Sequence, residues 1–153
     1  MSISSYENAT IVNFYSVVEK QGDLESQIPL YLSRISAGFP SPADDYVELK
    51  IDFNALLVDK AHATFCVRVK GNSMEGAGIL DGAILIVDRS KEPADGKIVV
   101  GIVNGEFTVK RILKSKKGIC LVAEHPAYDP IWIKEGMEFQ VFGVVTYIIN
   151  RAK

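Results

Sequence analysis

Ser73 lies in a stretch whose composition would display a side chain on a tight turn. Two apolar runs flank residues 71–82, and this connection is rich in glycine: Gly71, Gly76, Gly78 and Gly82. Glycine reaches backbone conformations closed to other residues, so the connection can turn tightly and present the Ser73 hydroxyl. A serine on such a turn is most often a turn residue that bonds its own backbone. It is a nucleophile only where a base lies beside it.

Lys110 is the candidate base. Asn104-Gly105 between two β-rich runs is a strong hairpin signal, and it predicts a strand over 107–113. Strand alternation puts Lys110 and Arg111 on opposite faces, so one cation points inward unless both faces are solvated. Keeping a lysine neutral at pH 7 costs about 4.6 kcal/mol, which desolvation can supply. The alternative is a lysine whose ammonium snorkels to solvent.

A second catalytic combination can be written from Ser73, His125 and Asp81 as a Ser-His-Asp triad. His125 precedes Pro126 in an expected loop, and nothing in the spacing supports this assignment. Downstream, a basic run surrounds the next hairpin. It is consistent with a solvated turn or with a contact surface for an acidic partner. Its members are Lys110, Arg111, Lys114, Lys116 and Lys117.

The elements that must position these residues are mostly strands. The sequence predicts a mainly β fold, a compact antiparallel β barrel or sandwich with an extended N-terminal arm, because short β-rich runs alternate with turn residues. In residues 9–36 the apolar spacing after Asn8 favours a helix, and Pro29 a second short helical turn. One short helical turn is expected within 54–60. The expected strands are 46–53, 63–70, 83–88, 97–103, 107–113, 118–124, 131–134 and 138–150.

Composition limits the function classes. With 153 residues and 48% hydrophobic content the chain can bury one core, which allows one domain plus an arm. The net charge of −2 argues against a nucleic-acid binder. There is no secretory signal pattern, and the longest apolar run, 141–149, is too short to span a bilayer as a helix, so we expect a soluble, cytoplasmic protein. Cys66 and Cys120 are expected to be free thiols, and no cofactor or metal is expected.

Several segments resemble, in the same order, the UmuD and LexA family of self-cleaving serine-lysine proteases, and the UmuD type more closely. The resemblance covers roughly residues 28–149, and it includes 37–48, which is similar to the UmuD cleavage segment. The other matching segments are Gly71-Asn72-Ser73-Met74, the Gly-Ile-Leu-Asp-Gly from Gly78, the Ile-Val-Asp from Ile86, the Asp-Gly-Lys-Ile-Val-Val from Asp95, the Gly-Glu-Phe-Thr-Val-Lys ending at Lys110, and Val141-Phe142-Gly143-Val144-Val145.

Residues 36–42 combine small residues with prolines, which keep the chain extended or turned. This pattern is typical of a linker, and such a linker is also a good protease substrate. The resemblance implies a scissile bond between Ala37 and Gly38. It divides the chain into an arm over 1–37, a linker over 38–45 and a β-rich protease domain over 46–153.

The expected mechanism is intramolecular peptide hydrolysis. Neutral Lys110 takes the Ser73 proton, and Ser73 Oγ attacks the Ala37 carbonyl to form an acyl-enzyme that water resolves. The backbone N–H groups of Asn72 and Ser73 are candidates for the oxyanion site, since the turn presents adjacent donors at the nucleophile.

The resemblance also implies partners. UmuD-like proteins cleave faster on a RecA filament formed on single-stranded DNA, and the trimmed homodimer then joins a UmuC-type Y-family translesion polymerase in the SOS response. No direct sequence-specific DNA binding and no membrane partner are expected. The arm is about a dozen residues longer than the resemblance leads us to expect for UmuD.

Three alternatives stay open. A LexA-like transcriptional regulator would need a DNA-binding element, and residues 1–37 are too few for a winged helix and are not basic. A non-enzymatic β-barrel interaction module would explain the same strands. A signal-peptidase-like enzyme would share the dyad chemistry but should carry a membrane anchor.

Overall fold

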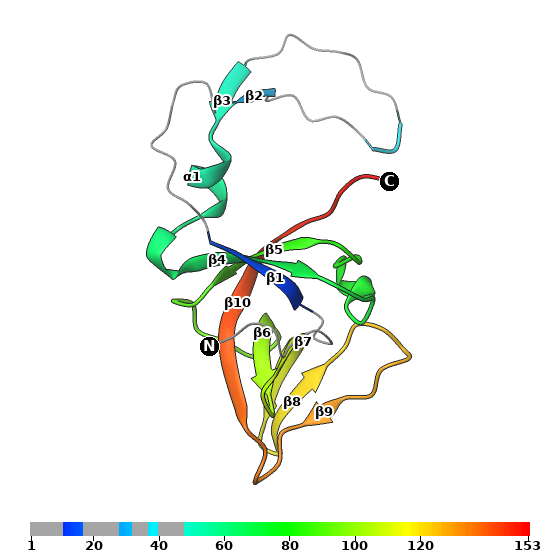
Figure 1. The fold of residues 1–153 in the computed structure, drawn as a ribbon. Coiled ribbons are helices and arrows are strands. Elements are labelled where there is room, and N and C mark those ends of the chain that lie inside the picture. The colour runs from blue at the N-terminus through cyan, green and yellow to red at the C-terminus, as the bar shows by residue number, and fades with distance from the viewer. Residues whose placement is uncertain (1–10, 17–27, 32–36, 40–47) are drawn as a thin grey trace. The chain divides into compact units, whose positions relative to one another are not determined.

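The computed structural model describes residues 11–16, 28–31, 37–39 and 48–153 (Figure 1). The chain divides into two compact units. One contains residues 1–17 and 60–153, and the other contains residues 18–59. The candidate serine and lysine both lie in the first unit. No helix in the described part of the chain is long and apolar enough to cross a membrane.

The first unit is built on one eight-stranded sheet in the order β1-β4-β5-β10-β6-β7-β8-β9, and all its neighbouring strands run antiparallel. The sheet has two edges, β1 and β9, so it is sandwich-like and does not close into a barrel. The strands are β1 (Ile11–Ser16), β4 (Thr64–Val69), β5 (Ile84–Asp88), β6 (Ile98–Val103), β7 (Glu106–Ser115), β8 (Gly118–Val122), β9 (Ile131–Trp132) and β10 (Phe139–Ile149).

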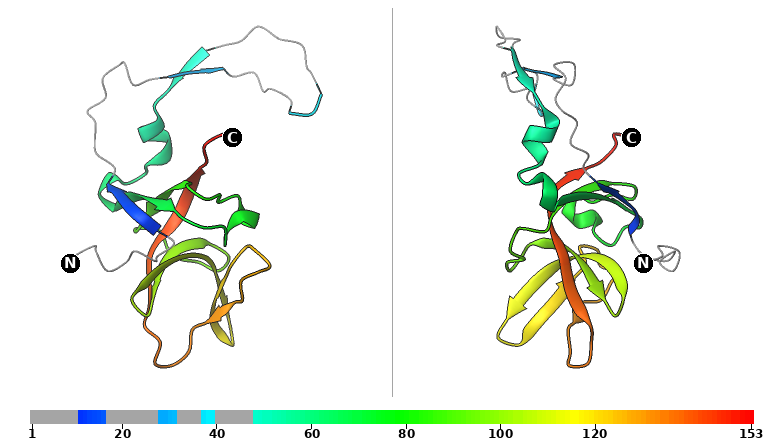
Figure 2. Two further views of the ribbon diagram at one scale, coloured as in Figure 1. Left: turned by 45° about the vertical axis from the view of Figure 1, so that its right-hand side comes forward. Right: turned by 60° about the vertical axis from the view of Figure 1, so that its left-hand side comes forward.

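The strand β10 ties the two halves of this sheet together. Its later residues pair with β5, and its earlier residues pair with β6, with a register shift in each ladder. Figures 1 and 2 show β10 running the length of the unit between these partners. Two short 3-10 turns complete the unit, η3 (Ala61–Ala63) and η4 (Glu75–Ala77), and η4 directly follows the candidate nucleophile.

The second unit contains a two-stranded antiparallel sheet and one short helix. The strands are β2 (Ile28–Tyr31) and β3 (Glu48–Ile51), and the helix is α1 (Phe53–Leu57). Asp52 begins the helix as its N-cap, and its carboxylate accepts hydrogen bonds from the N–H groups of Asn54 and Ala55.

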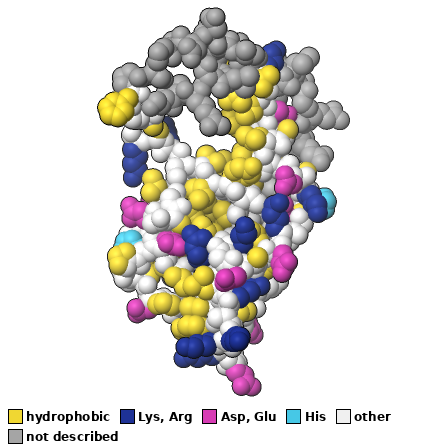
Figure 3. Space-filling model, turned by 180° about the vertical axis from the view of Figure 1, so that it is seen from behind, with side chains coloured by type: hydrophobic (Ala, Val, Ile, Leu, Met, Phe, Trp, Pro, Cys, Tyr) yellow, Lys and Arg dark blue, Asp and Glu magenta, His cyan; other side chains and the backbone are white. Residues whose placement is uncertain are grey.

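The core of the first unit is formed by side chains of the strands and by two side chains of the glycine-rich connection, residues 71–82. Met74 and Ile79 are buried with β-strand residues such as Val67, Leu85 and Val109. A second buried cluster contains Val99, Ile112, Leu121 and Val144. Because the connection inserts these two apolar side chains into the first cluster, it is fixed to the sheet directly after Ser73. Figure 3 shows charges of both signs interspersed on the reverse face.

The expected mainly β architecture is confirmed. All eight strands predicted from residue 46 onward are present with small differences at their ends, and α1 occupies the short helical turn expected within 54–60. The free thiols are also found: Cys120 is buried, Cys66 is half-buried, and burial raises the pKa of both thiols.

The helices expected in residues 9–36 are wrong where the structure describes that region. Residues 11–16 form the strand β1, which pairs with β4, and residues 28–31 form β2, which pairs with β3. Helical spacing of a few apolar residues is a weak signal, and pairing with a distant strand outweighs it. Pro29 is tolerated because β2 belongs to a two-stranded sheet, in which a strand has one free edge. The rest of residues 9–36 lies outside the described residues.

Candidate active site

The turn that carries Ser73 is closed by hydrogen bonds at its base. The N–H of Val69 donates to the Ala83 carbonyl at 2.8 Å, and the N–H of Gly82 donates to the Val69 carbonyl at 2.8 Å. Inside the turn, the N–H of Gly71 donates to Asp81 Oδ1 at 2.6 Å. Gly71 has a φ of +100°, a conformation that L side chains rarely adopt. The predicted glycine-supported turn is therefore present, and it is rigidly connected to β4 and β5.

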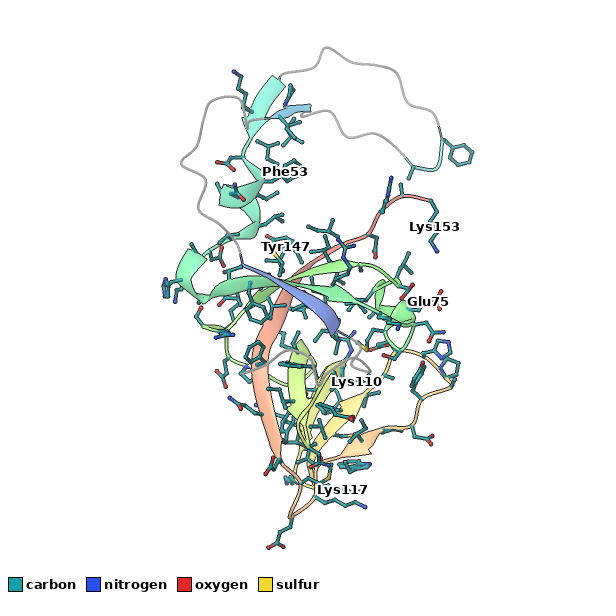
Figure 4. The ribbon with its side chains drawn as sticks, in the orientation of Figure 1. Phe53, Glu75, Lys110, Lys117, Tyr147 and Lys153 are labelled. Carbon is teal, nitrogen blue, oxygen red and sulfur yellow. The ribbon has the colours of Figure 1, made fainter. Side chains whose placement is uncertain are left out.

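Lys110 reaches this turn from the centre of β7. Its Nζ lies 3.1 Å from Ser73 Oγ, 3.0 Å from Thr108 Oγ1 and 3.0 Å from the Val109 carbonyl oxygen. Figure 4 shows Lys110 within the sheet, apart from the exposed Lys117 at the far end of the β7–β8 hairpin. The structure thus brings together the two side chains that the sequence pointed to.

The pair is almost removed from solvent. Ser73 and Lys110 are each 6% exposed. Within the described residues Lys110 has no carboxylate partner, and burial lowers the pKa of its amine. A buried ammonium without a counter-ion loses hydration that its three hydrogen-bond acceptors replace only in part, so burial shifts the amine toward its neutral form.

Lys110 Nζ donates to three oxygen atoms, on Ser73, Thr108 and Val109, which is the number of N–H donors of an ammonium. The same three contacts can also serve a neutral amine. An NH2 group has two N–H donors, which Thr108 Oγ1 and the Val109 carbonyl oxygen can accept, and one lone pair, which can accept a hydrogen bond from the Ser73 hydroxyl. In that form Lys110 is placed to act as a general base.

The backbone at the nucleophile offers donors for an oxyanion. Within the described part of the chain, the N–H groups of Asn72 and Ser73 donate no hydrogen bond. The Asn72 side chain is bound separately, because Tyr128 Oη donates to Asn72 Oδ1 at 2.9 Å. The backbone N–H groups of Asn72 and Ser73 are therefore the candidate donors to an oxyanion at this turn.

His125 and Asp81 make their hydrogen bonds elsewhere. His125 Nδ1 accepts from the N–H of Ala127 at 3.1 Å, and Asp81 accepts from Gly71. The imidazole ring also contacts the Tyr128 ring edge-on, with centroids 5.4 Å apart. Neither side chain contacts Ser73 among the described residues, so the structure does not form the alternative triad.

The expected cleavage segment is described only at residues 37–39, in the second unit. Ala37, Gly38 and Phe39 form an exposed bend, and Phe39 is 87% exposed. A Cβ added at Gly38 would meet nothing within 4 Å. This local geometry is compatible with a segment that a protease site can bind.

Sequence reasoning assigned no contact to several groups at the site. Strand alternation places Thr108 on the same face as Lys110, as expected, but its hydrogen bond to Nζ was not predicted. Two other contacts come from the segment after β8: the N–H of Glu124 donates to the Ser73 carbonyl at 2.9 Å, and the Glu124 carbonyl accepts from Gly76 at 2.8 Å. No local signal predicts these, since they join residues about fifty positions apart.

The basic run divides into two parts. Lys110 is buried, and Arg111 forms an ion pair with Glu124. Lys114, Lys116 and Lys117 are exposed along the β7–β8 hairpin. The solvated-turn interpretation therefore fits three of the five cations, and the other two belong to the site and its surroundings.

Comparison with known proteins identifies a family that matches most of the chain. Residues 29–146 match the family described as Peptidase S24-like. The chain is 42% identical over 137 residues to protein SamA of Salmonella typhimurium, covering 90% of this chain and 95% of SamA. It is 37% identical over 148 residues to protein ImpA of Escherichia coli, covering 92% and 95% of the two chains. It is 42% identical over 121 residues to protein MucA of Escherichia coli, covering 78% and 82%.

Proposed function

Because this chain belongs to the Peptidase S24-like family of self-cleaving serine peptidases, in its UmuD-like branch, we propose that Ser73 and Lys110 form the dyad with which it cuts its own chain between Ala37 and Gly38. One observation carries the assignment of the dyad: Lys110 Nζ lies 3.1 Å from Ser73 Oγ. The absence of a charged partner for this buried amine, among the described residues, supports a neutral base.

The chemistry follows from the contacts. The Lys110 lone pair takes the Ser73 hydroxyl proton while Oγ forms a bond to the Ala37 carbonyl carbon. The resulting oxyanion is stabilised by the N–H groups of Asn72 and Ser73. When the C–N bond breaks, protonated Lys110 gives its proton to the amine of Gly38, and an ester of Ser73 remains. Water, deprotonated by Lys110, then attacks the ester carbon. The bond from that carbon to Ser73 Oγ breaks, protonated Lys110 returns the proton to Oγ, and the new C-terminal carboxyl group of Ala37 is released.

Ser73 Oγ and Lys110 Nζ already lie 3.1 Å apart in the uncut chain, so in this proposal the step left to control is placement of the scissile bond. Holding reacting atoms in a near-attack geometry supplies a large part of a catalysed rate. A partner that holds residues 37–38 against Ser73 would therefore accelerate cleavage without changing the dyad. After cleavage, residues 1–37 are no longer joined by a peptide bond to the rest of the chain. The remaining chain consists of a linker over 38–45 and a protease domain over 46–153.

We place this cleavage in the SOS response to DNA damage, on the strength of the UmuD-like relatives. In this proposal a RecA filament on single-stranded DNA stimulates cleavage, and the trimmed homodimer acts in the cytoplasm as an accessory subunit of a UmuC-type Y-family error-prone polymerase. The net charge of −2 and the interspersed surface charges support protein partners rather than direct, sequence-specific DNA binding.

The test is the rate of self-cleavage with and without RecA, single-stranded DNA and a nucleotide. Full stimulation should require all three additions, because only together do they form the filament. The Ser73→Ala and Lys110→Ala variants should stay uncut under every condition. A rate that is the same with and without the filament would contradict the proposed partner, and cleavage by either variant would contradict the proposed dyad.

A further inference from the structure

Glu124 holds the backbone of the candidate nucleophile. Its N–H donates to the Ser73 carbonyl at 2.9 Å, and its own carbonyl accepts from the N–H of Gly76 at 2.8 Å. The approach is close, because a Cβ added at Gly76 would lie 2.7 Å from the Glu124 carbonyl oxygen. The segment after β8 is thus bonded to the nucleophile turn on both sides of Met74.

Glu124 is in turn anchored by Arg111. The Arg111 Nε donates to Glu124 Oε1, and one Arg111 Nη donates to the Gly96 carbonyl at 2.7 Å. Both members of this ion pair are about two-thirds buried, with side-chain exposures of 32% and 31%. A partly buried, charge-assisted hydrogen bond restrains its partners more than an exposed ion pair does.

Arg111 directly follows Lys110 on β7, so the two side chains leave opposite faces of one strand. Lys110 contacts Ser73 through its side chain, and Arg111 reaches the Ser73 backbone through Glu124. One strand therefore sets the position of the base and, through Glu124, the position of the nucleophile. The side chain of Lys110 and the ion pair of Arg111 thus act on the same turn from one strand, where Nζ and Oγ lie 3.1 Å apart.

We propose that Arg111 is a positioning residue for Ser73, acting through Glu124. The effect of Arg111 on the cleavage rate rests on the proposed function. Its effect on the position of the Ser73 backbone does not. The guanidinium is required because its planar fork bonds Glu124 and the Gly96 carbonyl at the same time, which an ammonium on a flexible stem does less well. Loss of Arg111 leaves Lys110 buried but frees Glu124, and through it the Ser73 turn.

The structural part is tested by amide hydrogen exchange in a Ser73→Ala background, which cannot cut itself if the proposed function holds. The observed amides are those of Glu124 and Gly76, and Gly82 serves as the reference because its N–H donates to Val69 at the far base of the turn. Arg111→Met and Glu124→Gln should speed exchange at Glu124 and Gly76 and leave Gly82 unchanged. Lys114→Met, an exposed cation on the same strand, is the control and should change none of the three.

The catalytic part is tested by the self-cleavage rate of the same variants with Ser73 intact, measured well below each melting temperature. Arg111→Met and Glu124→Gln should each lower the cleavage rate by up to roughly tenfold, since small misplacements of reacting groups are costly. The pH at which the rate is half-maximal should stay unchanged, because the burial of Lys110 is unchanged. Arg111→Lys should recover part of the rate, and the double variant should be no slower than the slower single variant.

The outcomes separate the two proposals. Unchanged exchange at Glu124 and Gly76 in Arg111→Met overturns the positioning role, whatever the cleavage rate. Faster exchange with an unchanged cleavage rate also overturns it. If the parent chain never cuts itself, the proposed function fails, while the exchange result still decides whether Arg111 positions the Ser73 turn.

Discussion

Lys110 Nζ lies 3.1 Å from Ser73 Oγ although the two residues are 37 positions apart, and no described carboxylate pairs with the lysine. The two other contacts of Nζ, to Thr108 and Val109, can accept both N–H groups of the amine once it is neutral. This one arrangement decides most of the behaviour expected of the protein.

Replacing Lys110 with arginine should abolish self-cleavage. Arginine keeps the positive charge and cannot act as a base, because its guanidinium is not deprotonated in proteins. We expect a loss of at least about 100-fold, as for removal of a general base. The measurement is the amount of cut chain over time by intact mass. Lys97→Arg, at an exposed position, should cleave at the parent rate, and a Lys110→Arg variant that still cleaves would contradict the role of the lysine.

The rate of self-cleavage should rise with pH and then level off. Only the neutral amine accepts the Ser73 proton, and burial lowers the pKa of Lys110 below its ordinary value of 10.5. The midpoint of the rise should therefore lie below pH 10.5. Rates measured at closely spaced pH values on folded protein give the midpoint. A rate that falls between pH 7 and pH 9 would be inconsistent with a lysine base.

Lys110 should also make stability depend on pH. Because its pKa is lower in the folded chain than in the unfolded chain, the unfolded chain binds more protons between the two values, and stability rises with pH in that window. Lys110→Met in a Ser73→Ala background removes this dependence. We expect the double variant to gain in stability relative to Ser73→Ala as pH falls. Urea unfolding at several pH values measures the difference, and a gap that widens as pH rises would show the opposite sign.

Gly76 should not tolerate alanine. The added methyl group would lie 2.7 Å from the Glu124 carbonyl oxygen, which is backbone and cannot move aside cheaply. Gly76→Ala should cost about 1 to 3 kcal/mol of stability and should slow self-cleavage, because it displaces the segment that bonds Ser73. Glu75→Ala, an exposed neighbour, is the matched control. Equal melting temperatures and equal rates for the two variants would argue against a tightly held turn.

Local patterns were sufficient to predict every strand from residue 46 onward and to mark Ser73 and Lys110 as candidates, whereas their assignment as a catalytic pair also drew on the family resemblance. Ser73 was found from its glycines and Lys110 from the Asn104-Gly105 hairpin, and both signals are local because turn geometry demands particular residues. The strands of residues 11–16 and 28–31 were not found, because their conformation depends on pairing with distant partners.

The contacts that complete the site depend on tertiary packing. Glu124 reaches Ser73 and Gly76 only after the sheet has formed, and Arg111 was read as part of a basic run because nothing local indicates its pairing with Glu124. Sequence patterns specify faces and turns, whereas the register between distant segments is set by the packed core.

The most direct measurement is the mass of the purified protein after incubation. The parent chain should yield a product that begins at Gly38, more quickly at pH 10 than at pH 7, and Ser73→Ala and Lys110→Ala should keep the full-length mass of 16.8 kDa. Far-ultraviolet circular dichroism confirms that each sample is folded. A folded parent chain that keeps its full-length mass at both pH values, with and without RecA on single-stranded DNA, would contradict the self-cleaving dyad.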